Sequence, residues 1–307
     1  MADVHEDSAL EAALGRVVRR VFPDGVLRRH SRLSGGVCAA IHALEVERPG
    51  GREERVVVRR PGAVGDAGVT AEEVEREFEL LRALRASGLP VPEPHLVDCS
   101  GEILATPYLV VDYVAGTTEV RPEGLADALE QMASFLARLH RLEVGRLRLP
   151  GLPPRDEPIR EMLTFLPDGV PERWRELLRE MGPVRSRNTR VLLHGDFWPG
   201  NALWSQGRLV GVIDWEDAAL GEPLSDLAAT RLELLWEHGW AASEDLTERY
   251  LARAPVDVRH LPLWDLYVAS AARTHMPTWR LAADVEARQQ ALAIEFSERA
   301  MRRILAM

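Results

Sequence analysis

The sequence predicts a mixed α+β protein in which a small β-rich N-terminal lobe precedes a larger helical C-terminal lobe. Short β-branched segments separated by Gly or Pro dominate residues 26–114. After Gly116 the chain carries long segments with the apolar periodicity of amphipathic helices. Because the pattern changes near residues 112–117, we expect one lobe over residues 1–114 and the other over residues 115–307.

The N-terminal lobe is expected to combine a sheet with one long helix. The segments with strand composition are GVLRRHSRLS, VCAAIHALEV, RVVVRR, HLVD and YLVVDYV. The helix is expected over residues 71–87, because apolar residues recur at helical spacing from Val74 to Leu84 and Gly88 follows directly.

The C-terminal lobe is expected to be a group of amphipathic helices. They correspond to LADALEQMASFLARLHRL, PERWRELLREM, PLSDLAATRLELLWEHG, LPLWDLYVASAARTHM and DVEARQQALAIEFSERAMRRIL. The proline-rich segment 144–158 between them is typical of a surface loop.

Composition limits the functions that the chain can serve. The formal charge of -10 disfavours nucleic acid as a partner and is compatible with a cationic small molecule. No apolar run is long enough to cross a bilayer, and the N-terminal segment MADVHEDSAL is polar and acidic, so we expect a cytoplasmic protein without a membrane partner. Cys38 and Cys99 are far apart in sequence and form no metal-binding motif.

The segment HGDFWPGN, residues 194–201, has the features of a functional loop. Pro199 and Gly200 exclude a helix through it, and the apolar runs RVLL and ALW on either side are typical of buried strands. The carboxylate of Asp196 and the amide of Asn201 are therefore presented by a loop on a rigid scaffold, as catalytic groups often are. The alternative is a turn that these side chains merely stabilise.

A second segment, LVGVIDWED, supplies another carboxylate. Residues 209–213 have the composition of a strand, and Asp214 follows it. If this strand pairs with ALW as a hairpin, Asp214 returns beside Asp196 and Asn201. Such oxygen ligands suit magnesium, and a carboxylate that is not a ligand is free to accept a proton from an attacking hydroxyl.

These two segments resemble the catalytic and metal-binding segments of the aminoglycoside phosphotransferase and choline kinase-like superfamily, which is related to protein kinases. The resemblance continues outward in the same order through RLSGGVCAAIHALEV, VVVRRP, REFELLRALRASGLPVPEP, YLVVDYVAG and GEPLSDLA, and it covers most of the chain. It implies a bilobal protein-kinase-like fold.

The resemblance also implies a role for each matched residue. Asp196 is the catalytic carboxylate, and Asn201 and Asp214 hold magnesium against the phosphates of ATP or GTP. The residues implied in nucleotide binding are Ser34, Gly35, Gly36, Arg59, Glu77, Asp112 and Val114. The last two belong to the hinge, whose backbone is expected to bind the base.

The sequence departs from the family pattern where a lysine normally anchors the phosphates, because the chain contains no lysine. Arg59 is the best candidate for this position, with Arg60 on the opposite face of the strand. Arg59 is able to hold a phosphate and to pair with Glu77. The alternative is a solvated arginine at the end of a strand.

Acidic and aromatic side chains of the helical lobe are candidates for binding an amine-bearing acceptor. They are Glu216, Asp217, Trp264 and Asp265. The alternative for the acidic residues is a solvated helix face. Three further polar residues are expected to act structurally: Asp226 braces the loop from a helix N-terminus, His194 supports it by hydrogen bonds, and His140 packs on a helix.

Together these features predict a kinase that transfers the γ-phosphate of a nucleoside triphosphate to a hydroxyl group of a small molecule. The acceptor class implied by the resemblance is an aminoglycoside or other antibiotic, or an amino alcohol, so antibiotic resistance is one expected role. Two alternatives are a catalytically silent nucleotide-binding protein, suggested by the missing lysine, and a metal-dependent hydrolase that uses His194, Asp196 and Asp214.

Overall fold

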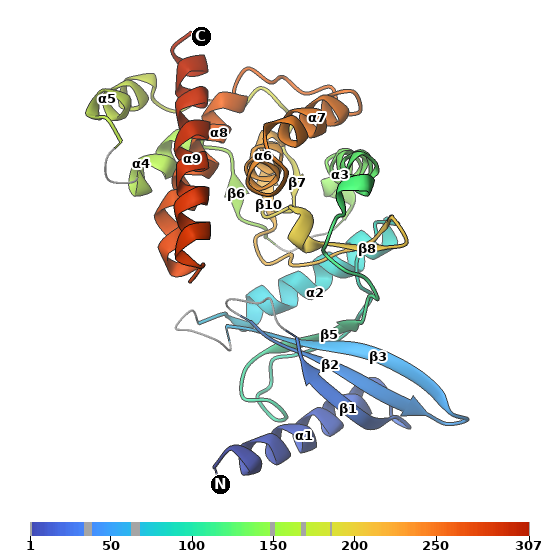
Figure 1. Cartoon of the computed structure of the whole chain (residues 1–307). Coiled ribbons are helices and arrows are strands. Elements are labelled where there is room, and N and C mark those ends of the chain that lie inside the picture. Colours follow the sequence, from blue (N-terminus) through green and yellow to red (C-terminus); the bar gives the residue numbers. More distant parts are fainter. Residues whose placement is uncertain are drawn as a thin grey trace. The chain divides into compact units, whose positions relative to one another are not determined.

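A computed structural model describes the chain over residues 2–33, 39–62, 68–147, 151–166, 170–184 and 186–306. The chain divides into two compact units, one within Met1–Ala115 and the other within Gly116–Arg148 and Leu152–Met307. Figure 1 labels the elements of both units. The predicted nucleotide contacts Ser34, Gly35 and Gly36 lie outside the described residues.

The first unit is built on one antiparallel sheet with the strand order β1-β2-β3-β5-β4. Its strands are β1 (Val26–Arg32), β2 (Ala39–Arg48), β3 (Arg52–Pro61), β4 (Pro94–Asp98) and β5 (Tyr108–Asp112). Each predicted strand segment is confirmed. The register places Val57 of β3 opposite Val111 of β5, so the strand that carries Arg59 is central to the sheet.

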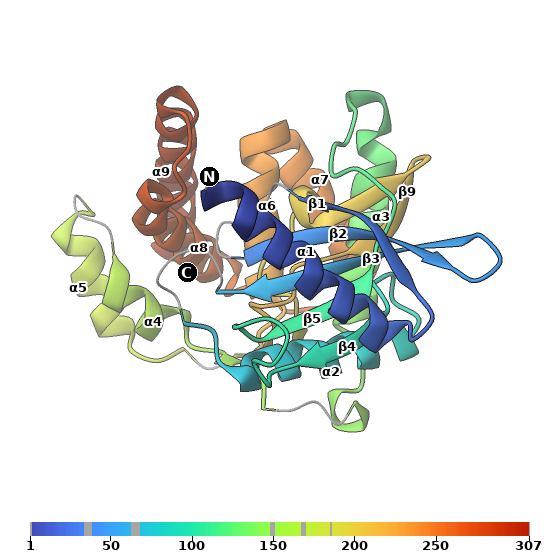
Figure 2. The ribbon, with the colours of Figure 1, turned by 90° about the horizontal axis from the view of Figure 1, so that it is seen from below.

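Helices α1 (Ala2–Val21) and α2 (Ala71–Ala86) lie on opposite faces of this sheet (Figure 1). The buried apolar side chains of α1 pack with those of β2 and β3, and Figure 2 shows α1 lying across the strands. Helix α2 was predicted and is confirmed; it starts with a capping box between Thr70 and Glu73. Helix α1 was not predicted, because its first turns are polar and the apolar residues at helical spacing begin only after them.

The second unit is mainly helical. Its helices are α3 (Leu125–Leu139), α4 (Pro158–Phe165), α5 (Glu172–Met181), α6 (Leu224–His238), α7 (Trp240–Leu251), α8 (Leu261–His275) and α9 (Ala283–Ile304). Short 3-10 turns occupy Pro122–Gly124, Val144–Arg146, Pro199–Asn201 and Met276–Thr278. All predicted helices are present, whereas α4 and α7 were not predicted.

Two small sheets in this unit carry the loops of interest. In the first, β7 (Val191–Leu193) pairs with β10 (Ala219–Gly221), which pairs with β6 (Pro154–Arg155). Segment 144–158, predicted as a surface loop, therefore contributes a strand. Gly221 permits this pairing, because a Cβ atom there would lie 2.0 Å from the backbone oxygen of Arg155.

The second small sheet is the predicted hairpin. Strand β8 (Ala202–Ser205) pairs antiparallel with β9 (Arg208–Val212). The turn residues Gln206 and Gly207 have φ values of 50° and 72°, as a tight hairpin turn requires. The hairpin is confirmed, and it returns the chain from Asn201 to Asp214.

Within the described part of the chain, no helix combines the length and apolar character needed to cross a membrane.

Candidate active site

The 194–201 loop follows β7 and rests on buried aromatic side chains of the second unit. His194 and Phe197 are fully buried. The ring of Phe197 stacks on Phe135 of α3 at 5.0 Å between centroids, and His194 lies 4.3 Å from the ring of Trp215. This packing anchors the loop on both sides of Asp196 and leaves Asp196 itself partly exposed.

Asp226, in the first turn of α6, holds the backbone of the loop as predicted. Its carboxylate accepts hydrogen bonds from the amides of His194 at 2.8 Å and Gly195 at 2.9 Å, and it also contacts His140 Nε2 at 3.2 Å. Burial alone would raise the pKa of Asp226, but its hydrogen bonds and the neighbouring histidines hold the pKa below its usual value. The carboxylate therefore stays charged at neutral pH.

Two further residues that position the loop were missed in the sequence. Thr230 donates a hydrogen bond to the carbonyl of Phe197 at 2.7 Å, and Arg155 donates one to the carbonyl of Gly195 at 3.0 Å. Thr230 lies four residues after Asp226 and so on the same face of α6, which is a usable sequence signal. Nothing in the proline-rich segment around Arg155 indicates its contact.

His194 supports the loop as a neutral side chain, in agreement with its predicted structural role. Burial lowers the pKa of His194 to about 4. Its Nε2 donates to the carbonyl of Ile213 at 3.0 Å, and its Nδ1 accepts from the amide of Asp196 at 3.3 Å. Both ring nitrogens are thus engaged within the protein, and neither is left to bind a metal.

Asp196 and Asn201 are joined directly. The amide nitrogen of Asn201 donates to the backbone oxygen of Asp196 at 2.8 Å and to its carboxylate at 3.0 Å. Burial, followed by the charges of Asp217 and Asp214, raises the pKa of Asp196 to about 6, although the bond from Asn201 acts in the opposite direction. A carboxylate with this pKa is suited to accept a proton near neutral pH.

Asp214 lies beside this pair because of the hairpin. The amide of Ile213 donates to the carbonyl of Asn201 at 3.0 Å, so Asp214 is the next residue after a direct backbone contact with Asn201. Asp214 has a φ value of 66°, a left-handed conformation that aspartate tolerates better than most residues. Such a conformation is often found at functional sites.

The turn after Asp214 approaches the loop just as closely. Gly195 has a φ value of 91°, and a Cβ atom at this position would lie 2.0 Å from the backbone oxygen of Asp217. Only glycine therefore fits where the two segments meet. The structure thus brings together Asp196, Asn201, Asp214 and Asp217, which the sequence analysis identified as candidate site residues.

This group of residues fits a magnesium ion. In the described part of the chain no hydrogen bond reaches the side-chain oxygen of Asn201, because its bonds to Asp196 are made by the amide nitrogen. That oxygen and the carboxylate of Asp214 are the hard ligands that magnesium prefers, and nucleotide phosphates commonly complete its coordination. No group of three or more His, Cys, Asp or Glu side chains among the described residues forms a metal site by itself.

The predicted acceptor contacts divide into two pairs. Glu216 and Asp217 are exposed in the turn beside the loop. Trp264 is 1% exposed and packs edge-on against Tyr267, and Asp265 is 3% exposed and ion-paired with Arg231. Trp264 and Asp265, which the sequence suggests as acceptor contacts, are thus buried and engaged by contacts within the protein.

Glu233 of α6 is an additional carboxylate near the loop. Burial, then the charges of Asp196 and Glu237, raise its pKa well above the usual value. Its interaction with Asp196 shows that the two carboxyl groups lie near one another, and the raised pKa favours the neutral form of Glu233.

In the first unit, Arg59 of β3 and Glu77 of α2 form a buried ion pair. The distance from Arg59 Nη1 to Glu77 Oε2 is 2.6 Å, and the side chains are only 11% and 7% exposed. Arg60, on the other face of β3, donates instead to Thr106 at 3.2 Å. Arg59 is therefore not a solvated arginine.

The hinge residues Asp112 and Val114 differ in their hydrogen bonding. The amide of Asp112 donates to the carbonyl of Glu93 at 2.9 Å, and its carboxylate contacts His95 Nε2 at 2.6 Å. Among the described residues, the amide of Val114 has no such partner. Of the two, Val114 is the better placed to bind a base through its backbone.

The chain is similar in sequence to curated proteins with two kinds of name. It is 26% identical to acyl-CoA dehydrogenase family member 11 of Rattus norvegicus over 249 residues, covering 65% of the chain and 30% of the rat protein. It is 27% identical to viomycin phosphotransferase of Streptomyces vinaceus over 202 residues, covering 59% of the chain and 67% of that protein. The chain spans less than a third of the length of the acyl-CoA dehydrogenase family relatives.

Solved structures show the same fold. The GDP complex of aminoglycoside 2'-phosphotransferase-IIIa has a TM-score of 0.67 at 19% identity, covering 94% of this chain and 99% of that one. An aminoglycoside phosphotransferase with ADP and hygromycin B has a TM-score of 0.64 at 17% identity, covering 92% and 98%. The expected mixed α+β, kinase-like fold is thereby confirmed.

The family profile decides the assignment. The profile of the phosphotransferase enzyme family matches residues 39–259, which include the sheet from β2 onward, the 194–201 loop and the β8–β9 hairpin. This range covers well over half of the chain. The protein therefore belongs to the phosphotransferase enzyme family.

Proposed function

We propose that this enzyme transfers the γ-phosphoryl group of ATP or GTP to a hydroxyl group of a small molecule. The observation that carries the proposal is the convergence of Asp196, Asn201 and Asp214 on one braced loop and one hairpin. Phosphoryl transfer depends mainly on positioning and on charge stabilisation, and this arrangement provides the groups needed for both.

Asp196 is proposed as the catalytic carboxylate. It orients the acceptor hydroxyl and accepts its proton as the oxygen attacks phosphorus. Asn201 keeps the carboxylate in place through its amide nitrogen. Asp226 and Arg155 fix the backbone on which Asp196 stands, so its position is set before substrate binds.

Asn201 and Asp214 are proposed as the protein ligands of magnesium. When bound, magnesium would supply positive charge that stabilises the charge on the nucleotide phosphates. Asn201 would ligate through its side-chain oxygen while its nitrogen remains on Asp196, so one residue connects the metal ligands to the base.

Nucleotide binding is proposed for the first unit. Arg59 would contact a phosphate while Glu77 holds its guanidinium, and the free amide of Val114 would bind the base. Solved structures of the same fold contain GDP or ADP, which supports a nucleoside triphosphate as donor. Asp112 is proposed to shape the hinge through His95 rather than to bind the base itself.

The proposed acceptor is a hydroxylated and preferably cationic small molecule. Glu216 and Asp217 are exposed carboxylates in the turn beside the loop, and their negative charge would attract amines. One relative is named a viomycin phosphotransferase, and a structure of the same fold holds hygromycin B. Other relatives are named as acyl-CoA dehydrogenase family members, so an acyl-CoA with a hydroxyl group is a second acceptor class.

A panel of acceptors tests the proposal. The protein would be incubated with ATP or GTP, magnesium and each of several aminoglycosides, viomycin, amino alcohols and hydroxyacyl-CoA thioesters. Mass spectrometry should find one added phosphoryl group on a member of the panel, and only with magnesium present. Nucleotide binding without any product would favour a silent nucleotide-binding protein, and hydrolysis of an acceptor without nucleotide would favour a hydrolase.

Replacing Arg59 tests how the phosphates are anchored. Arg59→Met should weaken ATP binding by about tenfold or more, because a charge-assisted contact to phosphate is lost. It should also lower the free energy of unfolding by about 3–5 kcal/mol, because the carboxylate of Glu77 is left buried without its partner. Calorimetric titration with ATP and denaturant unfolding measure the two effects.

A double variant separates the two roles of Arg59. Arg59→Met combined with Glu77→Leu removes both buried charges, so most of the lost stability should return. ATP affinity should stay low. Recovery of ATP affinity together with stability would show that Arg59 acts only on the fold.

A further inference from the structure

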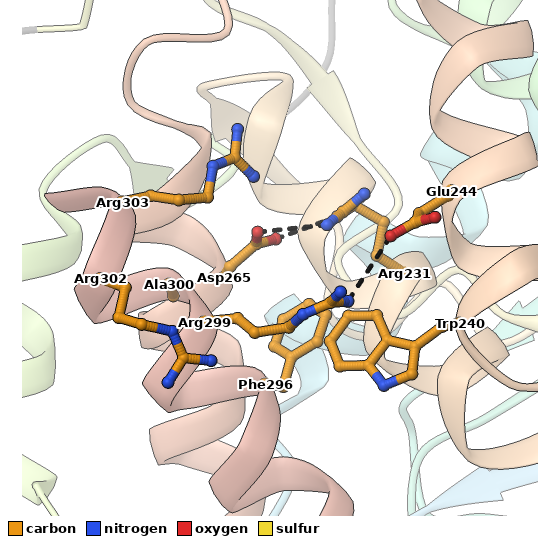
Figure 3. A pocket seen from close by; sticks show the side chains of 9 residues that line it. All are labelled: Arg231, Trp240, Glu244, Asp265, Phe296, Arg299, Ala300, Arg302 and Arg303. Atoms are coloured by element: carbon orange, nitrogen blue, oxygen red, sulfur yellow. Dashed lines mark hydrogen bonds and ion pairs between the residues drawn. The ribbon is translucent and has the colours of Figure 1, made fainter. Parts of the chain in front are cut away.

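A separate pocket of about 320 Å³ opens among helices α6, α7, α8 and α9 of the second unit. Four arginines line it, Arg231 from α6 and Arg299, Arg302 and Arg303 from α9, against two acidic residues. We call it the arginine pocket (Figure 3). None of its lining residues belongs to the 194–201 loop or to the turn after Asp214, so it is distinct from the proposed catalytic residues.

The base of the arginine pocket is a fixed ion pair. Arg231 donates from Nε and Nη2 to the two carboxylate oxygens of Asp265, at 3.1 and 3.3 Å, and from Nη1 to Thr247. The side chains of Arg231 and Asp265 are 8% and 4% exposed. Asp265 is thus occupied by Arg231 and cannot neutralise a second guanidinium equally well.

Aromatic rings fix another guanidinium at the rim. Arg299 lies over the ring of Trp240 at 3.9 Å, and Trp240 in turn stacks on Phe296 at 5.5 Å between centroids. A stacked guanidinium keeps its in-plane N–H groups available for other partners. Its partner Glu244 is 3.5 Å away and exposed, so this pair is weak.

Arg303 differs from Arg231 and Arg299 in its contacts. In the described part of the chain its side chain forms no ion pair or hydrogen bond, yet its charge acts on the buried Asp265. Figure 3 shows Arg303 and Arg299 on either side of the Arg231–Asp265 pair, while Arg302 points away. The arginine pocket therefore holds an excess of positive charge around a rigid base.

We propose that the arginine pocket binds the phosphate group of a small molecule. A phosphate carries a charge between about -1.5 and -2 at neutral pH and offers three acceptor oxygens. It would take hydrogen bonds from Arg299 and Arg303, which planar guanidinium groups form well. The volume is at the lower end of ligand pockets and admits a phosphate with a small organic body beside Trp240.

Calorimetric titration at constant ionic strength tests this proposal, with inorganic phosphate and phenyl phosphate as probes. Both should bind saturably at one site. Tighter binding of phenyl phosphate identifies a phosphate monoester as the ligand class, and equal affinities identify free phosphate. Absence of saturable binding for both probes would overturn the proposal.

Variants locate the binding. Arg303→Gln should weaken binding by about tenfold without unfolding the protein, because Arg303 is exposed and has no ion pair to lose. Arg299→Gln should act in the same direction. Arg288→Gln is the matched control, since it removes the same charge from an exposed position of α9 outside the pocket. Equal weakening by Arg288→Gln, or none by Arg303→Gln, would contradict the assignment.

Discussion

Asp196→Asn is expected to lower the rate of phosphoryl transfer by about 10²–10⁴-fold while the protein remains folded and binds nucleotide. Asparagine has nearly the same shape, and its side-chain oxygen still accepts the hydrogen bond from Asn201 that now reaches the Asp196 carboxylate. The change therefore removes the proton acceptor and leaves the loop in place. Steady-state transfer rates and calorimetric nucleotide titration give the two readouts.

The same variant is expected to be more stable than the wild type at neutral pH. The pKa of Asp196 is about 6 in the folded protein and 3.8 as its ordinary value, so the folded state binds the proton more tightly. The stability that this group contributes is present below pH 3.8 and is lost as the pH rises through about 6. At neutral pH the gain from Asp196→Asn should be about 3 kcal/mol, because the two pKa values differ by about two units.

Unfolding of the metal-free protein at several pH values checks this second effect. The difference in stability between Asp196→Asn and wild type should be small near pH 4 and should grow until about pH 6–7. Transfer at the wild-type rate by Asp196→Asn would refute the role of Asp196 as base. A stability difference that does not change with pH would refute the raised pKa.

Asp226→Asn is expected to cause the second large effect, a loss of both stability and activity. The Asp226 carboxylate accepts from two backbone amides and faces His140, and it is fully buried. An asparagine has only one side-chain oxygen, so it can accept from only one of these two backbone amides. Its side-chain N–H₂ group would face the other amide, which is also a donor. We expect the free energy of unfolding to fall by about 3 kcal/mol and transfer to fall by about 10²-fold or more, because the loop shifts under Asp196.

The pH dependence distinguishes this effect from a general loss of packing. The pKa of Asp226 is lowered, so its contribution is present at neutral pH and is lost as the pH falls below 3.8. The difference in the free energy of unfolding between wild type and Asp226→Asn should therefore become smaller as the pH is lowered. Asp127→Asn is the matched control: it also removes a carboxylate from the first turn of a helix, but an exposed one, and should change stability by no more than about 0.5 kcal/mol.

Much of the site was predictable because local chemistry fixes it. Pro199 and Gly200 force a loop, and the β8–β9 hairpin follows from two short apolar strands around a tight turn. The hairpin brings Asp214 back beside Asn201, and the lengths of the two strands and the turn are enough to predict this return from the sequence. Arg59 was the best candidate for the phosphate-anchoring position, and the structure pairs it with Glu77.

The remaining features depend on contacts between distant segments. Arg155 reaches Gly195 only because β6 joins β10, a pairing of two residues that carries no periodic signal. Trp264 and Asp265 follow one another in a helix, and both are buried by packing that the sequence does not show. Helix α1 was missed because its apolar stripe starts after polar turns.

A crystal structure of the protein with magnesium and the non-hydrolysable analogue AMP-PNP tests the central claim most directly. We predict a metal ion bound by the side-chain oxygen of Asn201, the carboxylate of Asp214 and phosphate oxygens, with Asp196 facing the γ-phosphate without binding the metal. A metal held by other side chains, or an Asp196 carboxylate turned away from the γ-phosphate, would contradict it.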